Sequence, residues 1–243
     1  YVDCGVDGFR FDAAKQIETP DDHSSYASDF WPTVVNGTTS YAQSTRGFTP
    51  YYYGELLQDT DNYGSLPISA YTKYMSATES VWSNDIRYKM EEHNASALRM
   101  SYFKDAPADK LVLWAESHDT YAGGTSKGVS ETNINKTWAL VTARADAMSL
   151  YLARRQGVKQ ADEMMGNIYV NSWSDASVGA ANKFHNAFNG QPEKIGNAGG
   201  IAYVVRGNSG VVLVNYQGTS KSVSDLSVGM ADGTYTDQVS CAS

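Results

Sequence analysis

Gly-Val-Asp-Gly-Phe-Arg-Phe-Asp-Ala-Ala-Lys, at residues 5–15, is the stretch that decides the fold. Its apolar residues alternate with polar or small ones, as in a short β-strand, and a helix-forming Ala-Ala-Lys follows. Side chains alternate across a strand, so Arg10 and Asp12 lie on one face. Arginine orients a carboxylate through forked hydrogen bonds and keeps it ionised. Asp12 therefore suits a nucleophile or a general base, with a purely structural Arg–Asp pair as the alternative.

Two further segments have the same form. Residues 51–57, Tyr-Tyr-Tyr-Gly-Glu-Leu-Leu, predict a second strand, which ends in Glu55. Residues 111–119, Leu-Val-Leu-Trp-Ala-Glu-Ser-His-Asp, predict a third strand. This third strand is more continuously apolar, so we expect it to be more deeply buried. Its polar end contains Glu116, His118 and Asp119.

The spacing of these strand ends is informative. Asp12 and Glu55 lie 43 residues apart, and Glu55 and Asp119 lie 64 apart. A strand–helix–strand unit takes roughly 30 residues or more, so the gaps fit one unit and then two. Apolar residues recur at helical spacing between or after these strands at Trp82, Ile86 and Met90, and at Ile134, Trp138 and Val141. The pattern predicts a parallel β/α architecture with its site at the carboxyl ends of the strands.

Three segments together carry a family resemblance. Residues 8–15, 54–58 and 116–119 resemble, in order and spacing, short regions of the α-amylase family, glycoside hydrolase family thirteen. Each segment alone is a weak signal, but the three on strand ends are specific. Further stretches are similar to secreted bacterial α-amylases: Thr-Pro-Asp-Asp at 19–22, Phe-Trp-Pro at 30–32 and Asn-Lys-Phe-His-Asn at 182–186.

The resemblance implies the catalytic residues. Asp12 matches the nucleophile, which forms a covalent glycosyl-enzyme, and Glu55 matches the general acid/base. Asp119 matches the third carboxylate, which stabilises the distorted, positively charged sugar ring. Retaining hydrolysis needs the nucleophile and the acid roughly 5 Å apart, and the two carboxyls must differ in protonation. The tyrosine run at 51–53 either helps to desolvate Glu55 or is ordinary strand packing.

The resemblance also implies binding residues. Arg10 matches the residue that orients the nucleophile, His118 a sugar-hydroxyl binder and Lys15 a residue that reaches the glucose on the leaving side. Residue 16 is Gln where many α-amylases have a His whose backbone carbonyl binds calcium. A carbonyl survives the change, so Gln16 is a candidate ligand for calcium, which favours oxygen. Residues 153–156, Ala-Arg-Arg-Gln, also depart from the family, whose members often have a proline there.

The expected fold class is α/β, and we expect the chain to be a fragment. The resemblance places Asp12, Glu55 and Asp119 on barrel strands four, five and seven, and a whole (β/α)8 barrel takes ~250 residues. We therefore predict a partial TIM (β/α)8 barrel, about strands 4 to 8, over residues 1–190. The start of an all-β C-terminal domain, incomplete at its end, is predicted over residues 191–243.

The later elements follow from local patterns. We predict a helix at 132–147, the eighth barrel strand at 148–152 and a closing helix at 175–189. Two β-branched runs separated by Arg-Gly-Asn-Ser-Gly predict a hairpin, with strands at 201–205 and 211–215. A third strand is expected at 221–226.

Composition limits the partners. A formal net charge of −8 argues against a phosphate-backbone binder, so no nucleic-acid partner is expected. No run approaches the ~20 apolar residues of a membrane span. The two cysteines, Cys4 and Cys241, match no metal-ligand spacing and are expected to be free thiols. By resemblance, we expect a secreted, monomeric protein whose partner is an α-glucan.

Four functions are compared. The leading one is endo-hydrolysis of α-1,4-glucosidic bonds in starch or glycogen by the parent protein, with residues 1–243 alone expected to be inactive. The alternatives are a transglycosylase of the same family and a non-catalytic carbohydrate-binding relative. A metal-dependent hydrolase that uses His118 and Asp119 is weaker, because it lacks further ligands at plausible spacing.

Overall fold

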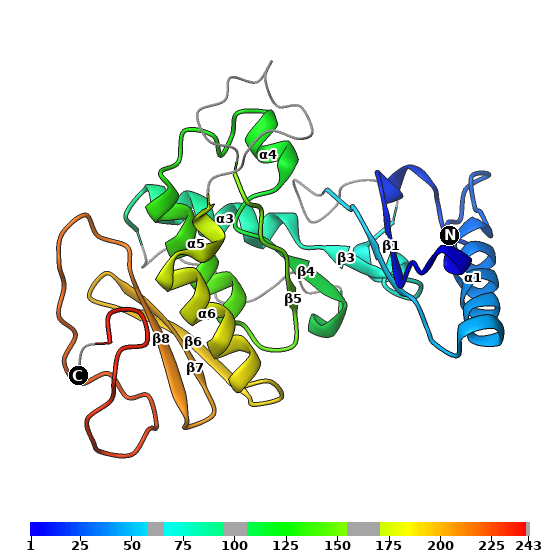
Figure 1. The fold of residues 1–243 in the computed structure, drawn as a ribbon. Coiled ribbons are helices and arrows are strands. Elements are labelled where there is room, and N and C mark those ends of the chain that lie inside the picture. The colour runs from blue at the N-terminus through cyan, green and yellow to red at the C-terminus, as the bar shows by residue number, and fades with distance from the viewer. Residues whose placement is uncertain (58–65, 95–105, 155–170, 242–243) are drawn as a thin grey trace. The chain divides into compact units, whose positions relative to one another are not determined.

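A computed structural model gives the structure of the chain and describes residues 1–57, 66–94, 106–154 and 171–241 (Figure 1). The chain divides into two compact units. The first comprises Tyr1–Val81 with Ser101–Val112, and the second comprises Trp82–Met100 with Leu113–Ser243. The predicted boundary between residues 190 and 191 stays a prediction.

The α/β part contains a five-stranded sheet in the order β1-β2-β3-β4-β5. Its strands are β1 (Gly8–Phe11), β2 (Tyr51–Gly54), β3 (Ser76–Thr78), β4 (Leu111–Leu113) and β5 (Met148–Ser149). β1 pairs with β2, β2 with β3 and β3 with β4, all in parallel. The 64 residues between Glu55 and Asp119 left room for one additional strand, and β3 is that strand. All three residues of β4 are buried, as expected. The predicted α/β fold class is confirmed.

Helix α1 (Phe30–Arg46) belongs to the first unit, as does β1 (Figure 1), and its Trp31 packs on Phe11 of that strand. The Trp31 ring meets the Phe11 ring edge-on at 5.1 Å, and the Trp31 indole N–H donates to the Ile17 carbonyl at 2.9 Å. The helix ends at Gly47, whose φ of 71° is one that glycine adopts without strain. The remaining short helices of this unit are η1 (Val2–Cys4), η2 (Ala14–Gln16), α2 (Ile68–Tyr71) and η4 (Ala108–Lys110).

The second unit contains most of the longer helices. The predicted stripe Trp82, Ile86 and Met90 is fully buried on α3 (Ser80–Glu91), whose residues from Trp82 onward belong to this unit. The other helices are α4 (His118–Ala122), α5 (Glu131–Ala143), η6 (Asn171–Ser174) and α6 (Ala176–Ala187). Helix α5 begins one residue before its predicted range and ends four residues before the end of that range, and α6 is one residue shorter at its start and two at its end.

An antiparallel sheet in the order β6-β7-β8 completes the second unit, and α5 packs against β7 and β8 (Figure 1). Its strands are β6 (Glu193–Ala198), β7 (Ile201–Arg206) and β8 (Gly210–Asn215), so the predicted hairpin is confirmed. The strand predicted at 221–226 is wrong: that segment is mostly exposed and forms no strand. The third strand is β6, whose Gly196 lies against the Tyr203 ring, where a Cβ would clash.

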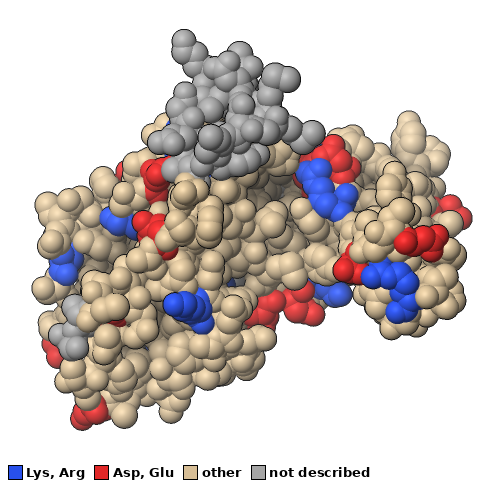
Figure 2. Space-filling view, in the orientation of Figure 1, with Lys and Arg blue, Asp and Glu red and all other residues tan. Residues whose placement is uncertain are grey.

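Charged side chains are scattered over the face of the molecule in Figure 2, and uncharged residues cover most of it. Cys4 and Cys241 are both exposed, free thiols, as expected. In the part of the chain that the structure describes, no helix has the length and apolar character needed to cross a bilayer.

Candidate active site

The pairing of β1 with β2 brings two carboxylates side by side. The register places Phe11 opposite Gly54, so Asp12 and Glu55 are each the first residue beyond a paired strand end. The pairing continues for one more step, because the Glu55 N–H donates to the Phe11 carbonyl at 2.9 Å. Two acidic side chains from distant parts of the sequence thus share one edge of a parallel sheet.

Arg10 bridges the two carboxylates. Its Nη1 contacts Asp12 Oδ1, and its Nη2 lies 3.1 Å from Glu55 Oε2. Partial burial works to lower the pKa of Arg10. The hydrogen bond that Arg10 donates to Asp12, together with the charges of Glu55 and Asp12, outweighs that effect, so the pKa of Arg10 is raised. Because the single planar guanidinium of Arg10 contacts both carboxylates, an oxygen of Asp12 and an oxygen of Glu55 lie close to each other.

The two carboxylates differ in exposure. The Asp12 side chain is 77% exposed, whereas that of Glu55 is 11% exposed. Asp12 is therefore open to a substrate, and Glu55 is held in the protein surface. The sequence predicted the Arg10–Asp12 contact but did not predict that Glu55 shares the same arginine.

The backbone after β1 also holds Glu55. The Ala13 N–H donates to Glu55 Oε2 at 2.9 Å, and the Ala14 N–H donates to the Glu55 carbonyl at 3.0 Å. Ala13 has a φ of 43°, in the left-handed region that costs a non-glycine residue of the order of 1 kcal/mol. The turn after Asp12 is therefore strained, and it directs one N–H at the Glu55 carboxylate and the next at the Glu55 main-chain carbonyl.

In the tyrosine run before Glu55, the central residue, Tyr52, packs inside the protein. The buried Tyr52 ring stacks on Phe9 and Phe11, and the Tyr52 hydroxyl lies 3.0 Å from Thr39 Oγ1 of α1. Tyr51 stacks on Tyr53 at 6.2 Å between ring centroids. These contacts favour the packing interpretation of the run for Tyr52.

Lys15 and Gln16 follow in η2. Lys15 Nζ donates to the Leu57 carbonyl at 2.9 Å, and Gln16 is exposed at the end of the helical turn. The predicted helix after Asp12 is therefore only this 3-10 turn.

The calcium expectation has little support in the described residues. Within residues 1–57, 66–94, 106–154 and 171–241, no group of three or more His, Cys, Asp or Glu side chains is placed to hold a metal. Calcium takes six to eight oxygen ligands, and the Gln16 carbonyl supplies one. The Gln16 carbonyl alone does not make a calcium site, so calcium binding stays a prediction and no chemical step is derived through it.

The second unit positions His118 and Asp119 at the start of α4. Ser117 caps this helix: its side chain accepts from the Thr120 N–H at 3.2 Å, and its own N–H donates to Thr120 Oγ1 at 3.0 Å. His118 Nε2 lies 3.4 Å from Asp119 Oδ1, and both side chains are more than half exposed. A capped helix start therefore presents the two predicted substrate-facing residues to solvent.

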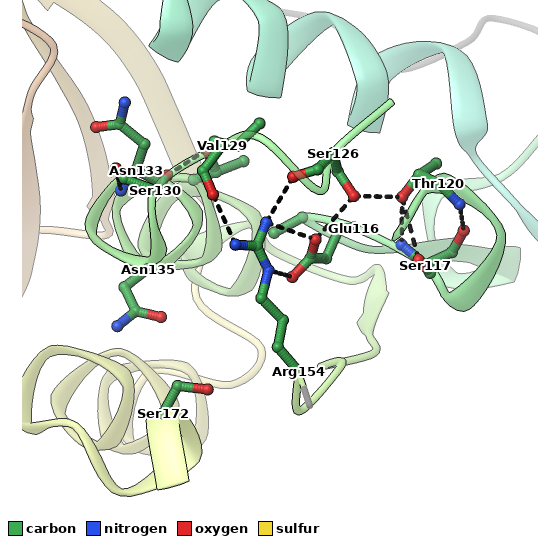
Figure 3. Close-up of polar contacts among 12 residues, drawn as sticks. Glu116, Ser117, Thr120, Ser126, Val129, Ser130, Asn133, Asn135, Arg154 and Ser172 are labelled. Atoms are coloured by element: carbon green, nitrogen blue, oxygen red, sulfur yellow. Dashed lines mark hydrogen bonds and ion pairs between the residues drawn. The ribbon is translucent and has the colours of Figure 1, made fainter. Parts of the chain in front are cut away.

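Sequence reasoning missed the residue that partners Glu116. Glu116 is buried and forms a two-point ion pair with Arg154, with Nε–Oε1 at 2.6 Å and Nη2–Oε2 at 2.9 Å (Figure 3). The only signal was the departure at 153–156, of which residues 155 and 156 lie outside the described residues. Asp12 and Glu55 belong to the first unit and Asp119 to the second, so the convergence of all three acids stays a prediction.

No protein-family model matches the chain. The chain is 31% identical to an α-amylase of Clostridium acetobutylicum over 241 residues, which cover 96% of this chain and 29% of that protein. It is 27% identical to an α-amylase of Butyrivibrio fibrisolvens, over 98% of this chain and 28% of that protein. The chain therefore spans less than a third of the length of these curated relatives.

Solved structures show the same fold. A mutant of α-amylase I from Eisenia fetida, crystallised in complex with maltohexaose, matches 81% of this chain and 46% of its own chain, with a TM-score of 0.61 at 16% identity. The α-amylase from H. orenii matches 88% of this chain and 52% of its own, with a TM-score of 0.57 at 14% identity. Near-complete coverage of this chain by α-amylase sequences and the shared α/β fold agree with the motifs at the strand ends, and the chain is similar to α-amylases over almost its whole length.

Proposed function

We propose that the protein hydrolyses internal α-1,4-glucosidic bonds of starch or glycogen with retention of the anomeric configuration. The observation that carries this proposal is the pairing of Asp12 and Glu55 at adjacent parallel strand ends, bridged by Arg10. Retaining glycosidases need two neighbouring carboxyl groups, of which one attacks the sugar and the other transfers protons. The α-amylase relatives and the maltohexaose-bound structural neighbour support an α-glucan as the substrate.

In the first half of the proposed cycle, Asp12 attacks the anomeric carbon and the glycosidic C–O bond breaks. Glu55 enters protonated and gives its proton to the leaving oxygen. A glycosyl ester of Asp12 results, and the shortened glucan with its new hydroxyl departs. The exposure of Asp12 and its contact with Arg10 suit the attacking group, because it must be accessible and oriented.

In the second half, Glu55 takes a proton from water, and the resulting hydroxide attacks the same carbon. The Asp12 ester bond breaks, and the carboxylate is restored. Asp119 stabilises the positive charge that develops on the ring in both steps. His118 binds a sugar hydroxyl, and Lys15 contacts the glucose on the leaving side.

The test uses the full-length protein that carries residues 1–243. Wild type is expected to release reducing ends from soluble starch, with the first product in the α-anomeric form by proton NMR. Asp12→Asn and Glu55→Gln are each expected to lower kcat by roughly 10²–10⁴-fold, because each removes a reacting carboxylate. Asp7→Asn is the matched control: Asp7 is 76% exposed and pairs with Arg46 at 2.8 Å, just before β1. It should keep full activity.

Other outcomes would replace the proposal. Loss of activity in Asp7→Asn equal to that in Asp12→Asn would remove the catalytic assignment. New glycosidic linkages or cyclic products would identify a transglycosylase, in which a sugar hydroxyl replaces water. Binding of starch without cleavage by wild type would identify a carbohydrate-binding relative. Secretion and a monomeric state are part of the same proposal and are tested by culture fractionation and by light scattering.

A further inference from the structure

Glu116 and Arg154 form a buried polar centre in the second unit. The Arg154 guanidinium makes two contacts with the Glu116 carboxylate and also donates to two carbonyls: Val129 at 2.6 Å through Nη1 and Ser126 at 2.7 Å through Nη2 (Figure 3). Both charged side chains are nearly inaccessible to solvent, at 1% exposure for Glu116 and 8% for Arg154. Neither side chain is open enough to meet a polymer substrate.

Strand pairing brings these two residues together. The Leu150 N–H, just after β5, donates to the Leu113 carbonyl of β4 at 2.8 Å. Glu116 lies three residues beyond Leu113, and Arg154 lies four beyond Leu150, so the two side chains meet past the strand ends. The ion pair therefore ties the chain that leaves β5 to the chain that leaves β4.

A chain of hydrogen bonds runs from this pair to the start of α4. Ser126 Oγ donates to Glu116 Oε2 at 2.8 Å and lies 3.1 Å from Thr120 Oγ1. Thr120 is the partner of Ser117 in the helix cap. His118 and Asp119 lie between these two capping residues in the sequence, so the hydrogen bonds of the cap fix the backbone on both sides of them.

We propose that Glu116 and Arg154 are positioning residues, which set the activity by holding the backbone of His118 and Asp119 in place. This inference rests on the proposed function, in which Asp119 stabilises the charged ring. Displacement by about 1 Å of a group that acts on the transition state costs on the order of 10²-fold in rate. A lysine at 154 would supply the charge but not the planar fork that reaches Glu116 and two carbonyls at once.

The chain offers a matched control pair. Arg144 contacts Glu193 through Nε and Nη2, with the Nη2–Oε1 distance at 2.6 Å, and the Arg144 side chain is 3% exposed. Glu193 also accepts from the Ala145 N–H at 2.7 Å. This second two-point pair joins the end of α5 to β6, and the Glu193 carboxylate binds Arg144 and the Ala145 N–H, which lie outside the segment 117–129. Loss of its carboxylate therefore reports the stability cost without the positioning effect.

The experiment compares Glu116→Gln, Arg154→Lys and Glu193→Gln in the full-length protein, with kcat and KM on soluble starch and the thermal midpoint measured for each. Glu116→Gln and Arg154→Lys are expected to lower kcat roughly 10- to 100-fold with KM within about twofold, at a temperature where all three are folded. Glu193→Gln is expected to lower the midpoint while kcat stays within about twofold of wild type.

Hydrogen exchange supplies a readout that does not depend on activity. Glu116→Gln should speed exchange of amides in the segment 117–129, such as those of Ser126 and Val129, and Glu193→Gln should not. If Glu116→Gln does not fold, Ser126→Ala replaces it. That variant cuts the link to Thr120 and should lower kcat severalfold in the same direction.

Equal kcat in Glu116→Gln and Glu193→Gln would overturn the positioning role. A wild-type kcat in Arg154→Lys would overturn it too. Unchanged exchange in the segment 117–129 would overturn it as well. A wild-type protein that cleaves no glucan would instead refute the proposed function, and the exchange result would still decide whether the pair orders this segment.

Discussion

Gly54→Ala is predicted to disturb the candidate active site directly, because Gly54 immediately precedes Glu55. A Cβ at this position would lie 2.5 Å from Met75 Sδ and 2.9 Å from the Ala14 Cβ. The Met75 side chain is flexible and can move aside. The Ala14 Cβ is attached to the backbone of η2, so relief of that contact requires the turn itself to shift.

The expected cost follows from these contacts. Extra atoms in a well-packed core cost typically 1–3 kcal/mol, and Ala14 is fully buried. The shift also strains the hydrogen bond from the Ala14 N–H to the Glu55 carbonyl and the neighbouring one from Ala13 to the Glu55 carboxylate. We therefore expect a thermal midpoint lower by several degrees and, where kcat on starch is measurable, a loss of about tenfold or more.

Gly37→Ala is the matched control for the same chemical change. Gly37 lies on the exposed side of α1 in the same unit, with nothing within 4 Å of an added Cβ. Alanine should stabilise the helix by about 0.5–1 kcal/mol and leave kcat unchanged. If Gly54→Ala unfolds at the same temperature as Gly37→Ala and has the same kcat, the reasoning from close packing is refuted.

Two further predictions concern stability. Burial raises the pKa of Tyr71 to about 12, with smaller contributions from the charges of Glu18 and Asp22. The stability that Tyr71 contributes is therefore complete below pH 10 and is lost as the pH rises towards 12. Tyr71→Phe should flatten the fall of the thermal midpoint between pH 10 and pH 12. Parallel curves of thermal midpoint against pH for wild type and Tyr71→Phe would contradict this. Asp175 caps α6 by accepting from the Ser177 N–H at 2.8 Å, and Asp175→Ala should cost about 1 kcal/mol by chemical denaturation, with Asp175→Asn close to wild type as the control.

Local patterns predicted the elements that carry the site. Strand alternation placed Arg10 and Asp12 on one face, and the structure shows the contact between them. The spacing of the acidic strand ends left room for an additional strand, which is β3. Both features depend only on residues a few positions apart or on the length of a strand–helix–strand unit, so they can be predicted from the sequence alone.

Weak local signals led to the errors. The segment Ala14–Gln16 has helix-forming residues but makes only a 3-10 turn, because the backbone at Ala13 turns towards Glu55. β6 contains Gly196 and Asn197, which disfavour strands, and forms because β7 pairs with it along its whole length. Tertiary pairing outweighed intrinsic preference in that strand.

The sequence by itself determined the α/β class, the acidic strand ends and the similarity to α-amylases. Only the tertiary structure decided that Arg10 serves Glu55 as well as Asp12, and that the buried partner of Glu116 is Arg154. The reason is physical: the face on which a side chain lies follows from the local backbone period. Its partner 38 or 45 residues away follows from strand register and burial, which exist only once the chain has folded.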